Sequence, residues 1–405
     1  MDEIKNFLES LEVETEEKTE KFKDVFLVTL TSANLPFESF GKGFTKEEAL
    51  ISAYGEMCER IITRNFFEEY YINGLYPDAA VIPEFLNKEL MEFYEIDKLT
   101  DDELIDFNSD VFEILSIPFT DLNGKITYFP INLIQNIYAS NGMAFHSSLD
   151  KAYYNAKSEV IERFVKFQVI KYALPLPKIS HPLNSSNIQF YDATLGGQYP
   201  VIAASYIKDD RIILSFGCDV DKEKAAKKAY LELMQTKLEK KGNIINDIDA
   251  VRSSYNIQKH FINLSGDIHE NFFKKPYFNE AIWNFKELIT PKKEYFKIYK
   301  KGKFWAVHLI IPGFSEVYPI SDLIYNNINY PKFERDIILN FDKYDTADVL
   351  ELLDNLFVAD VGEYIGVIFE KHYLPKEYAQ LVVQNKKPKF SKKYENLKKL
   401  AKRLY

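Results

Sequence analysis

The sequence predicts an α+β protein in which a turn-and-helix unit is repeated and the sheets are mixed or antiparallel. Three observations support this class. Apolar, β-branched runs alternate with helical patterns, short turns join them, and one acidic motif occurs twice in similar surroundings. The chain has 405 residues, of which 15% are aromatic, so it can bury a large core in one domain or two.

The first half of the chain contains one predicted strand, two predicted helices and a loop-rich stretch. Val25–Leu30 is apolar and β-branched, which predicts a strand. Thr45 followed by Glu48 forms a capping box, so a helix is expected to begin just after Thr45. The acidic stretch of residues 77–121 is predicted as mostly loop. After it, Ile126–Tyr138 is apolar and β-prone and leads into a second long helix.

The second half of the chain contains more strands and then becomes helical. Four runs are predicted as strands from their β-branched and apolar content: Ile188–Ala193, Val201–Ile207, Ile212–Phe216 and Phe304–Ile311. From about Arg335 onward the pattern is helical. We therefore expect one domain over residues 1–334 and a helical C-terminal extension over residues 335–405.

The repeated acidic motif is the most informative functional signal. Its two copies span residues 52–60 and 155–163, and each contains a small polar residue followed by Glu-any-any-Glu-Arg. The polar residue, both glutamates and the arginine fall on one stripe of a helix. Two such stripes suit a site for several cations, because Mg²⁺ takes oxygen ligands and bridges them to phosphates. One stripe alone could be a solvated helix face, but the repetition argues against that interpretation.

Glycine-containing turns precede both copies of the motif. Residues 41–43 are Gly-Lys-Gly and residues 140–142 are Ser-Asn-Gly. A glycine-rich turn before a helix N-terminus is compatible with phosphate binding, and an ordinary turn glycine is the alternative. A third, looser unit begins at residues 215–217 and leads into a helix that carries Lys228, Glu232 and Gln235.

Composition and simple motifs argue against several classes of protein. A net charge of −10 argues against a general nucleic-acid binder. Cys58 and Cys218 cannot build a disulfide framework. With no signal peptide or long apolar run, we expect a soluble protein of the reducing cytoplasm. The six histidines show no zinc pattern, and the sequence has neither a Rossmann fingerprint nor a Walker A loop.

These residues resemble the YcaO family of ATP-dependent enzymes that modify peptide backbones. The likeness runs from about Gly41 to about Asn329 and rests mainly on the two Glu-any-any-Glu-Arg helices. Within the family, the chain is most similar to the stand-alone members that assist RimO, because of the stretches Leu195–Ile202 and Ile311–Pro319. RimO is the radical enzyme that methylthiolates an aspartate of a small-subunit ribosomal protein.

The resemblance implies ATP and Mg²⁺ as cofactors and assigns roles to the motif residues, although it names no catalytic residue. The implied metal ligands are Glu56, Glu59, Glu159, Glu162 and Glu232. The implied ATP-binding residues are Lys42, Ser52, Glu56, Arg60, Asn155, Arg163 and Gln235. Carboxylates that share such a pocket without cations should repel one another and raise each other's pKa.

The function implied by the resemblance is ATP- and Mg²⁺-dependent activation of a backbone amide by phosphorylation, in support of RimO-dependent β-methylthiolation. The alternatives are a thioamide- or azoline-forming peptide modifier, or a scaffold that binds ATP and docks RimO without turnover. Azoline-forming relatives end in a proline-rich tail, which this sequence lacks. The resemblance further implies a homodimer, with RimO and the ribosomal protein as partners. We expect neither membrane binding nor sequence-specific nucleic-acid binding.

The segment after Phe390 is predicted as an amphipathic helix with a basic outer face. Leu397, Leu400 and Leu404 recur at helical spacing among lysines and an arginine. Two interpretations remain open. The helix could be a docked terminal helix with a solvated charged side, or it could contact an RNA-rich partner such as a ribosomal assembly intermediate.

Overall fold

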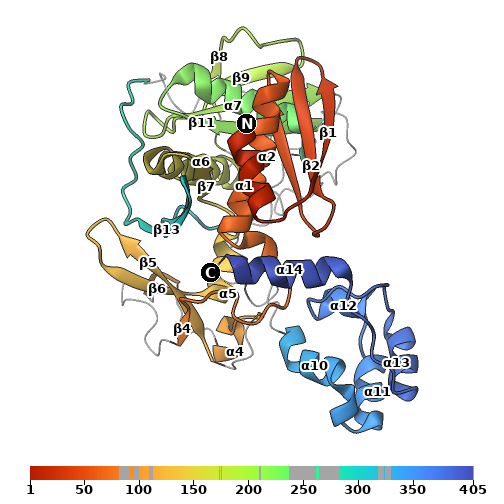
Figure 1. Ribbon diagram of the computed structural model, residues 1–405. Coiled ribbons are helices and arrows are strands. Elements are labelled where there is room, and N and C mark those ends of the chain that lie inside the picture. The colour runs from red at the N-terminus through yellow and green to blue at the C-terminus, as the bar shows by residue number, and fades with distance from the viewer. Residues whose placement is uncertain are drawn as a thin grey trace.

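In the residues that it describes, the computed structural model has three antiparallel sheets with helices packed between them (Figure 1). The fold class predicted from the sequence is confirmed. The structure describes residues 1–81, 92–94, 100–108, 113–172, 174, 176–208, 211–236, 261–263, 283–317, 323 and 330–404. A helix with the length and apolar composition of a membrane span does not occur in this part of the chain.

The first sheet has the order β1-β2-β3 and follows an N-terminal helix, α1 (Asp2–Ser10). Its strands are β1 (Thr15–Phe22), β2 (Val25–Ser32) and β3 (Glu38–Gly43). The predicted strand at Val25–Leu30 is confirmed as β2. β1 was missed because its glutamates, lysines and threonines are exposed along most of the strand and show no apolar alternation. Pairing with β2 along its whole length holds β1 in place.

The second sheet has the order β12-β11-β10-β9-β8 and confirms three predicted strands. Its members are β8 (Lys178–Ile179), β9 (Ile188–Asp192), β10 (Val201–Lys208), β11 (Arg211–Cys218) and β12 (Phe261–Asn263). β10 and β11 form a hairpin whose register runs from Val201 opposite Cys218 to Lys208 opposite Arg211. This pairing buries one face of the sheet against the helices.

The third sheet combines segments from both halves of the chain, and two sequence predictions here need correction. Its strands are β4 (Ala80–Val81), β5 (Leu115–Asp121), β6 (Ile126–Pro130), β7 (Met143–His146), β13 (Tyr295–Lys301) and β14 (Phe304–Ile310). β5 lies in the stretch predicted as mostly loop, and a short helix, α4 (Asp101–Leu104), lies there too.

The β-prone segment Ile126–Tyr138 is a strand only as far as Pro130. The chain then forms a helical turn, α5 (Ile131–Leu133), and a π-helical turn, Ile134–Tyr138. The local β propensity of this segment is overridden, because Leu133, Ile137 and Tyr138 are buried in the largest hydrophobic core from a helical backbone.

Three strand-and-helix units build the centre of the molecule. α2 (Lys46–Ile62) follows β3, α6 (Leu149–Lys171) follows β7, and α7 (Lys222–Gln235) follows β11. Each helix contacts the sheet of its own strand and one neighbouring sheet: α2 reaches β7, α6 reaches β11, and α7 reaches β3. The contacts therefore close a ring in which the three helices lie around a common centre.

Glycines in the strands allow these helices to pack closely, which corrects their predicted role. Gly41 lies within β3, and a Cβ there would stand 2.0 Å from the carbonyl oxygen of Ala49 in α2. Gly217 lies within β11, and a Cβ there would stand 2.2 Å from the carbonyl oxygen of Ala225 in α7. The close neighbour is helix backbone, so these glycines lie in strands and serve helix packing, and the prediction that Gly41 lies in a turn is wrong.

Gly142 also has a structural role. Its φ of +80° is in the left-handed region, and a Cβ there would stand 2.2 Å from the carbonyl oxygen of Leu309. Strand β7 intervenes between this turn and α6, so Gly142 does not lie at the N-terminus of the helix. The capping box at Thr45 and Glu48 is confirmed at the start of α2.

The C-terminal part of the chain is helical. α10 (Tyr330–Leu339), α11 (Thr346–Asp354), α12 (Val361–Tyr364) and α13 (Pro375–Val383) form a lobe at the lower right of Figure 1. α14 (Lys392–Arg403) then returns to the body. α10 runs across residues 334 and 335, the domain boundary predicted from the sequence, and that division stays a prediction.

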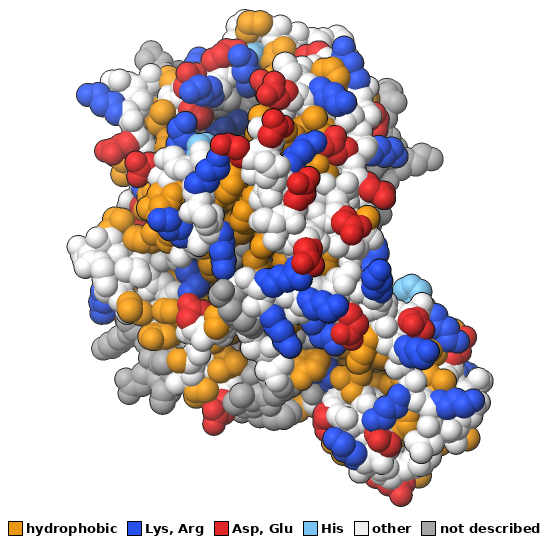
Figure 2. All heavy atoms as spheres, in the orientation of Figure 1, with side chains coloured by type: hydrophobic (Ala, Val, Ile, Leu, Met, Phe, Trp, Pro, Cys, Tyr) orange, Lys and Arg blue, Asp and Glu red, His pale blue; other side chains and the backbone are white. Residues whose placement is uncertain are grey.

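α14 is amphipathic, as predicted, and is part of the fold. Leu397 and Leu400 are buried in the same core as Leu8 and Phe37. Polar contacts reinforce the packing: the Tyr394 hydroxyl donates to the Tyr71 carbonyl at 2.6 Å, and Arg403 pairs with Glu12 at 2.7 Å. Figure 2 shows basic side chains along the outer side of this helix. The idea that this basic face contacts a partner remains a prediction.

Candidate functional site

A cavity of about 470 Å³ lies at the centre of the ring formed by α2, α6 and α7. It contains seven residues that were assigned to the site from the sequence: Lys42, Ser52, Asn155, Glu159, Glu162, Arg163 and Glu232. They come from β3 and from all three helices. The tertiary structure therefore brings the two copies of the acidic motif and the looser third unit to one place.

The three units carry residues at equivalent positions, of which Glu56, Glu59 and Gln235 do not line the cavity. Gly41 in β3, Ala144 in β7 and Gly217 in β11 are each followed by a helical alanine at the same interval. Counted from these positions, the equivalent sets are Ser52, Asn155 and Lys228; Glu56, Glu159 and Glu232; and Glu59, Glu162 and Gln235. The third unit thus has lysine and glutamine where the other two have a small polar residue and a glutamate.

Basic side chains neutralise two of the carboxylates. The Lys42 ammonium group forms an ion pair with Glu232 and also donates a hydrogen bond of 2.7 Å to the side-chain oxygen of Gln235. Arg163 pairs with Glu159 through Nη2 at 2.6 Å, one helical turn away. Without other ligands, the site is therefore held together by its own ion pairs.

Glu56, Glu59 and Arg60 lie beside the cavity and do not line it. Arg60 is within 3.7 Å of Glu56 and 3.6 Å of Glu59. The backbone N–H of Phe40 donates to Glu56 at 2.9 Å, which fixes this carboxylate against β3. Glu59 is close enough to α6 to interact with Glu159, and this carboxylate contributes to the rise of the Glu59 pKa.

Two carboxylates of the cavity, Glu159 and Glu162, have raised pKa values, as expected for neighbouring acids. Burial raises the pKa of Glu162 to about 7, and the negative charges of Glu232 and Glu159 add to the effect. Burial is also the first cause of the raised pKa values of Glu159 and Glu59. The predicted repulsion is present, but loss of solvent is the larger effect.

The cavity wall also contains residues that the sequence-based site did not include: Ser158, Lys166, Phe216, Lys228 and Leu231. Lys166 is buried and forms no ion pair within the described part of the chain. Its burial, together with the charge of Arg163, lowers the Lys166 pKa to about 7. The helical spacing from Glu162 and Arg163 could have indicated this lysine.

Lys228 was recognised as part of the third unit but was not assigned to the site. Its ammonium group donates to the Cys218 carbonyl at 2.8 Å and to Ser158 Oγ at 3.3 Å, and lies 3.2 Å from Asp219. The backbone N–H of Cys218 in turn donates to Glu162 at 3.2 Å. These contacts join the end of β11 to the acidic stripe of α6.

The carboxylates of the cavity suit cations whose remaining ligands are phosphate oxygens. Within the described residues, no three acidic, histidine or cysteine side chains converge closely enough to hold a metal ion by themselves. Mg²⁺ commonly takes only one or two carboxylates and completes its shell with water and phosphate oxygens. Arg163 Nη1 is buried and has no hydrogen-bond partner among the described residues. A bound anion would satisfy this donor, and bound cations would relieve the repulsion among the carboxylates.

Comparison with known proteins relates the chain to one family. Residues 40–315 match the family model described as YcaO cyclodehydratase, ATP- and Mg²⁺-binding. A protein from Haemophilus influenzae described as uncharacterized is 29% identical over 399 aligned positions, covering 82% of this chain. The ribosomal protein S12 methylthiotransferase accessory factor YcaO of Escherichia coli is 30% identical over 378 positions, covering 78% of this chain. The chain matches 68% and 64% of the lengths of these two relatives.

A solved structure shares the fold. YcaO from Methanopyrus kandleri, bound with AMPPCP and Mg²⁺, superposes with a TM-score of 0.51 at 14% sequence identity. The superposition covers 77% of this chain and 90% of the other.

Proposed function

The chain belongs to the YcaO family, and from this membership we propose that the cavity among α2, α6 and α7 binds ATP together with Mg²⁺. The observation that carries the proposal is that one cavity contains both a buried cationic donor without a hydrogen-bond partner among the described residues and carboxylates that are close to other acids. Arg163 Nη1 is a buried cationic donor without a partner among the described residues, and Glu159 and Glu162 are carboxylates whose pKa values are raised. Phosphates would satisfy the arginine, and cations would satisfy the carboxylates.

The residues of the cavity have distinct roles in this proposal. Lys42 and Arg163, which now neutralise Glu232 and Glu159, would direct their charge towards the phosphates. The two glutamates would then be available to the cations, so the charge balance of the cavity is kept. We extend the metal-ligand role to Glu56, Glu59 and Glu162 and the ATP-binding role to Ser52, Asn155, Arg60 and Gln235.

We propose that the reaction is activation of a peptide backbone amide. ATP supplies a phosphoryl group for the amide oxygen, which is otherwise a poor leaving group. The protein's own contribution is to hold phosphates and cations in a buried cavity whose lysine and arginine side chains offset the phosphate charge. Charges interact more strongly there than in water. Mg²⁺-dependent ATP hydrolysis that rises on addition of a peptide substrate would distinguish this enzyme from an ATP-binding scaffold.

We propose support of RimO-dependent β-methylthiolation of a small-subunit ribosomal protein as the biological role. The 30% identity to the Escherichia coli accessory factor supports this role. The test is mass spectrometry of ribosomal proteins from cells that carry the gene, lack it, or carry its Glu162→Gln form. Loss of methylthiolation in both altered strains is expected, and full methylthiolation in the strain that lacks the gene would exclude the role.

Cyclodehydration of a peptide is a second candidate, because the matching family model is described as a cyclodehydratase. The same mass spectra distinguish cyclodehydration from support of RimO-dependent methylthiolation. A cyclodehydratase would leave a protein or peptide that has lost water in the presence of the gene, with ribosomal methylthiolation unchanged.

We also propose that residues 1–334 form the ATP-binding catalytic domain, that residues 335–405 form a helical extension, and that the protein is a homodimer. Limited proteolysis tests the division, since cleavage near residue 334 should come first, and the cleaved protein should still bind ATP with its two pieces associated through α14. Native mass spectrometry of the full chain tests the dimer.

A further inference from the structure

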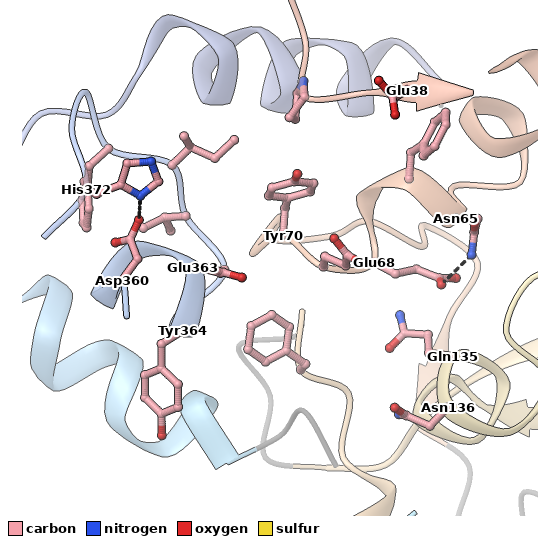
Figure 3. A pocket seen from close by; sticks show the side chains of 18 of the residues that line it. Glu38, Asn65, Glu68, Tyr70, Gln135, Asn136, Asp360, Glu363, Tyr364 and His372 are labelled. Atoms are coloured by element: carbon pink, nitrogen blue, oxygen red, sulfur yellow. Dashed lines mark hydrogen bonds and ion pairs between the residues drawn. The ribbon is translucent and has the colours of Figure 1, made fainter. Parts of the chain in front are cut away.

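A second, larger cavity of about 1140 Å³ lies between the body of the protein and the C-terminal lobe. The body contributes the segments Pro36–Glu38, Asn65–Tyr70 and Gln135–Ala139, and the lobe contributes residues 360–372 (Figure 3). None of these residues lines the cavity among α2, α6 and α7. We call this second cavity the acidic groove.

Acidic side chains outnumber basic ones in the wall of the acidic groove. Its carboxyl groups belong to Glu38, Glu68, Glu69, Asp360, Glu363 and Glu370. The basic residues of the wall are Lys371 and His372, and the Nδ1 atom of His372 is in hydrogen-bonding contact with Asp360. Glu38, Glu69, Glu363 and Glu370 are exposed. The groove therefore has a surplus of negative charge that solvent and a ligand can both reach.

Aromatic rings lie among these carboxylates. Tyr70 stands between the two sides of the groove in Figure 3. Its hydroxyl has a pKa raised to about 12 by burial and by the charges of Glu69 and Glu363, which come from opposite sides. Phe107 and Tyr364 add further rings to the wall. Carboxylates next to aromatic faces suit lysine and arginine side chains, which combine a positive head with a stem that packs on rings.

An unpaired amide also lies in the wall. Both polar atoms of the Gln135 side chain are buried and have no hydrogen-bond partner among the described residues. The π-helical turn Ile134–Tyr138 carries this glutamine and Asn136 into the groove (Figure 3). A primary amide with a free donor and a free acceptor can form hydrogen bonds with both groups of a peptide backbone.

A chain of polar contacts joins the acidic groove to the acidic stripe of α2. Arg60, which lies beside Glu56 and Glu59, donates to the side-chain oxygen of Asn65 at 3.2 Å. The amide nitrogen of Asn65 donates to Glu68 at 2.9 Å. Glu68 also accepts from the Tyr76 hydroxyl at 3.0 Å. The acidic groove is therefore linked by hydrogen bonds to the acidic stripe of α2, which lies beside the first cavity.

We propose that the acidic groove binds an extended, basic segment of a partner polypeptide. The surplus of carboxylates selects positive charge, the rings pack against lysine or arginine stems, and the Gln135 amide pairs with the backbone. The inference stands without the proposed function, because binding in the groove needs neither ATP nor turnover.

The experiment uses the full chain and a fluorescein-labelled, unstructured nonapeptide of arginine, lysine and glycine. Fluorescence anisotropy should show saturable binding that weakens with salt, since the contacts are ionic. Glu69→Gln combined with Glu363→Gln removes the two charges beside Tyr70 and should weaken binding roughly tenfold or more. Glu370→Gln provides an independent second variant and should weaken binding in the same direction.

A matched control removes the same charge elsewhere. Glu9 and Glu16 are exposed on α1 and β1 and do not line the groove, so Glu9→Gln with Glu16→Gln should leave the affinity unchanged. ATP affinity, measured in every variant, should also be unchanged by the groove substitutions, which separates this inference from the ATP proposal.

Three results would overturn the inference. The wild-type protein could fail to bind the peptide, or the groove variants could bind it as well as the control variant does. The third result comes from competition with spermine, which carries positive charge but has no peptide backbone and no side chains that pack on rings. Competition by spermine as strong as that of unlabelled peptide would show that the groove is a general polycation site.

Discussion

The ammonium group of Lys42 donates a hydrogen bond of 2.7 Å to the side-chain oxygen of Gln235. Lys42 lies in β3 and Gln235 lies at the end of α7, so the contact joins the first and third repeated units. The same ammonium group is paired with Glu232. One lysine therefore ties together two units that are far apart in the sequence, directly at the wall of the candidate ATP cavity.

Replacing this lysine should weaken ATP binding. Lys42→Met removes a charge-assisted contact, and such contacts contribute about 1.5 to 3 kcal/mol, which corresponds to a loss of roughly tenfold or more in affinity. Titration calorimetry with ATP and Mg²⁺ measures the change. Lys46→Met is the matched control, since Lys46 is exposed on the same part of the chain and does not line the cavity. Equal affinities in the two variants would contradict the role of Lys42.

Replacing a metal-ligand candidate should weaken binding only when Mg²⁺ is present. Glu59→Gln and Glu162→Gln each remove a charged oxygen ligand and should lower Mg²⁺-dependent ATP affinity by roughly 10- to 100-fold, as substitutions in the shell around bound metals commonly do. The same titration with EDTA should show a much smaller difference from the wild type. If both variants bind Mg²⁺ and ATP normally, the assignment of the metal ligands is wrong.

Binding should release protons near neutral pH. Burial and the charge of Glu232 raise the pKa of Glu162 to about 7, so this carboxyl group is partly protonated there. A cation lowers the pKa of a carboxylate ligand and expels the proton, so affinity should rise between about pH 6 and about pH 8. Calorimetry in buffers of different ionisation enthalpy counts the protons, and Glu162→Gln should remove most of the release.

The same shift has a defined sign for stability without ligand. The Glu162 pKa lies above its ordinary value of 4.5, so the folded protein binds this proton more tightly than the unfolded chain does. Protonation therefore contributes stability at low pH, and this contribution is lost as pH rises from about 4.5 to about 7. Urea unfolding across this range should show a smaller decline for Glu162→Gln. An unchanged decline would mean that other groups dominate.

The strand glycines should prove structural. Gly41→Ala places a Cβ against the backbone of α2 and should lower the free energy of unfolding by about 3 kcal/mol, the upper part of the usual range for overpacking. Gly55→Ala is the matched control, because apart from its chain neighbours and the adjacent helix backbone nothing lies within 4 Å of its Cβ position in the middle of α2. It should raise the unfolding free energy by about 1 kcal/mol through helix propensity. Similar melting temperatures for the two variants would contradict close helix-on-strand packing.

The basic face of α14 can be tested without breaking the fold. Lys392, Lys393, Lys399 and Lys402 are exposed, so replacing all four with glutamine should leave the melting temperature within a few degrees of the wild type. If the face binds RNA-rich partners, the variant should lose salt-sensitive association with ribosomal particles. Deletion from Phe390 onward should instead destabilise the protein, because Leu397 and Leu400 belong to the main core. Unchanged association of the four-lysine variant would leave α14 with a structural role only.

The sequence by itself determined the features that depend on neighbouring residues. The capping box at Thr45 and the stripe formed by Glu56, Glu59 and Arg60 follow from helical spacing, and both are present in α2. The fold class and strands such as Val201–Lys208 also follow from local apolar patterns. These inferences succeeded because helix capping and side-chain periodicity are set within a few residues along the chain.

Only the tertiary structure decided which groups meet. The ring of three helices brings Lys42 to Gln235 and leaves Arg163 Nη1 unpaired among the described residues. The tertiary structure also shows that Gly41 packs against a helix, that the exposed segment β1 is a strand, and that Gln135 faces the acidic groove. Tyr318 and Pro319, the end of the stretch Ile311–Pro319 that carries part of the family resemblance, lie outside the described residues. Contacts, burial and pKa values depend on segments brought together by folding, and no local pattern encodes that pairing.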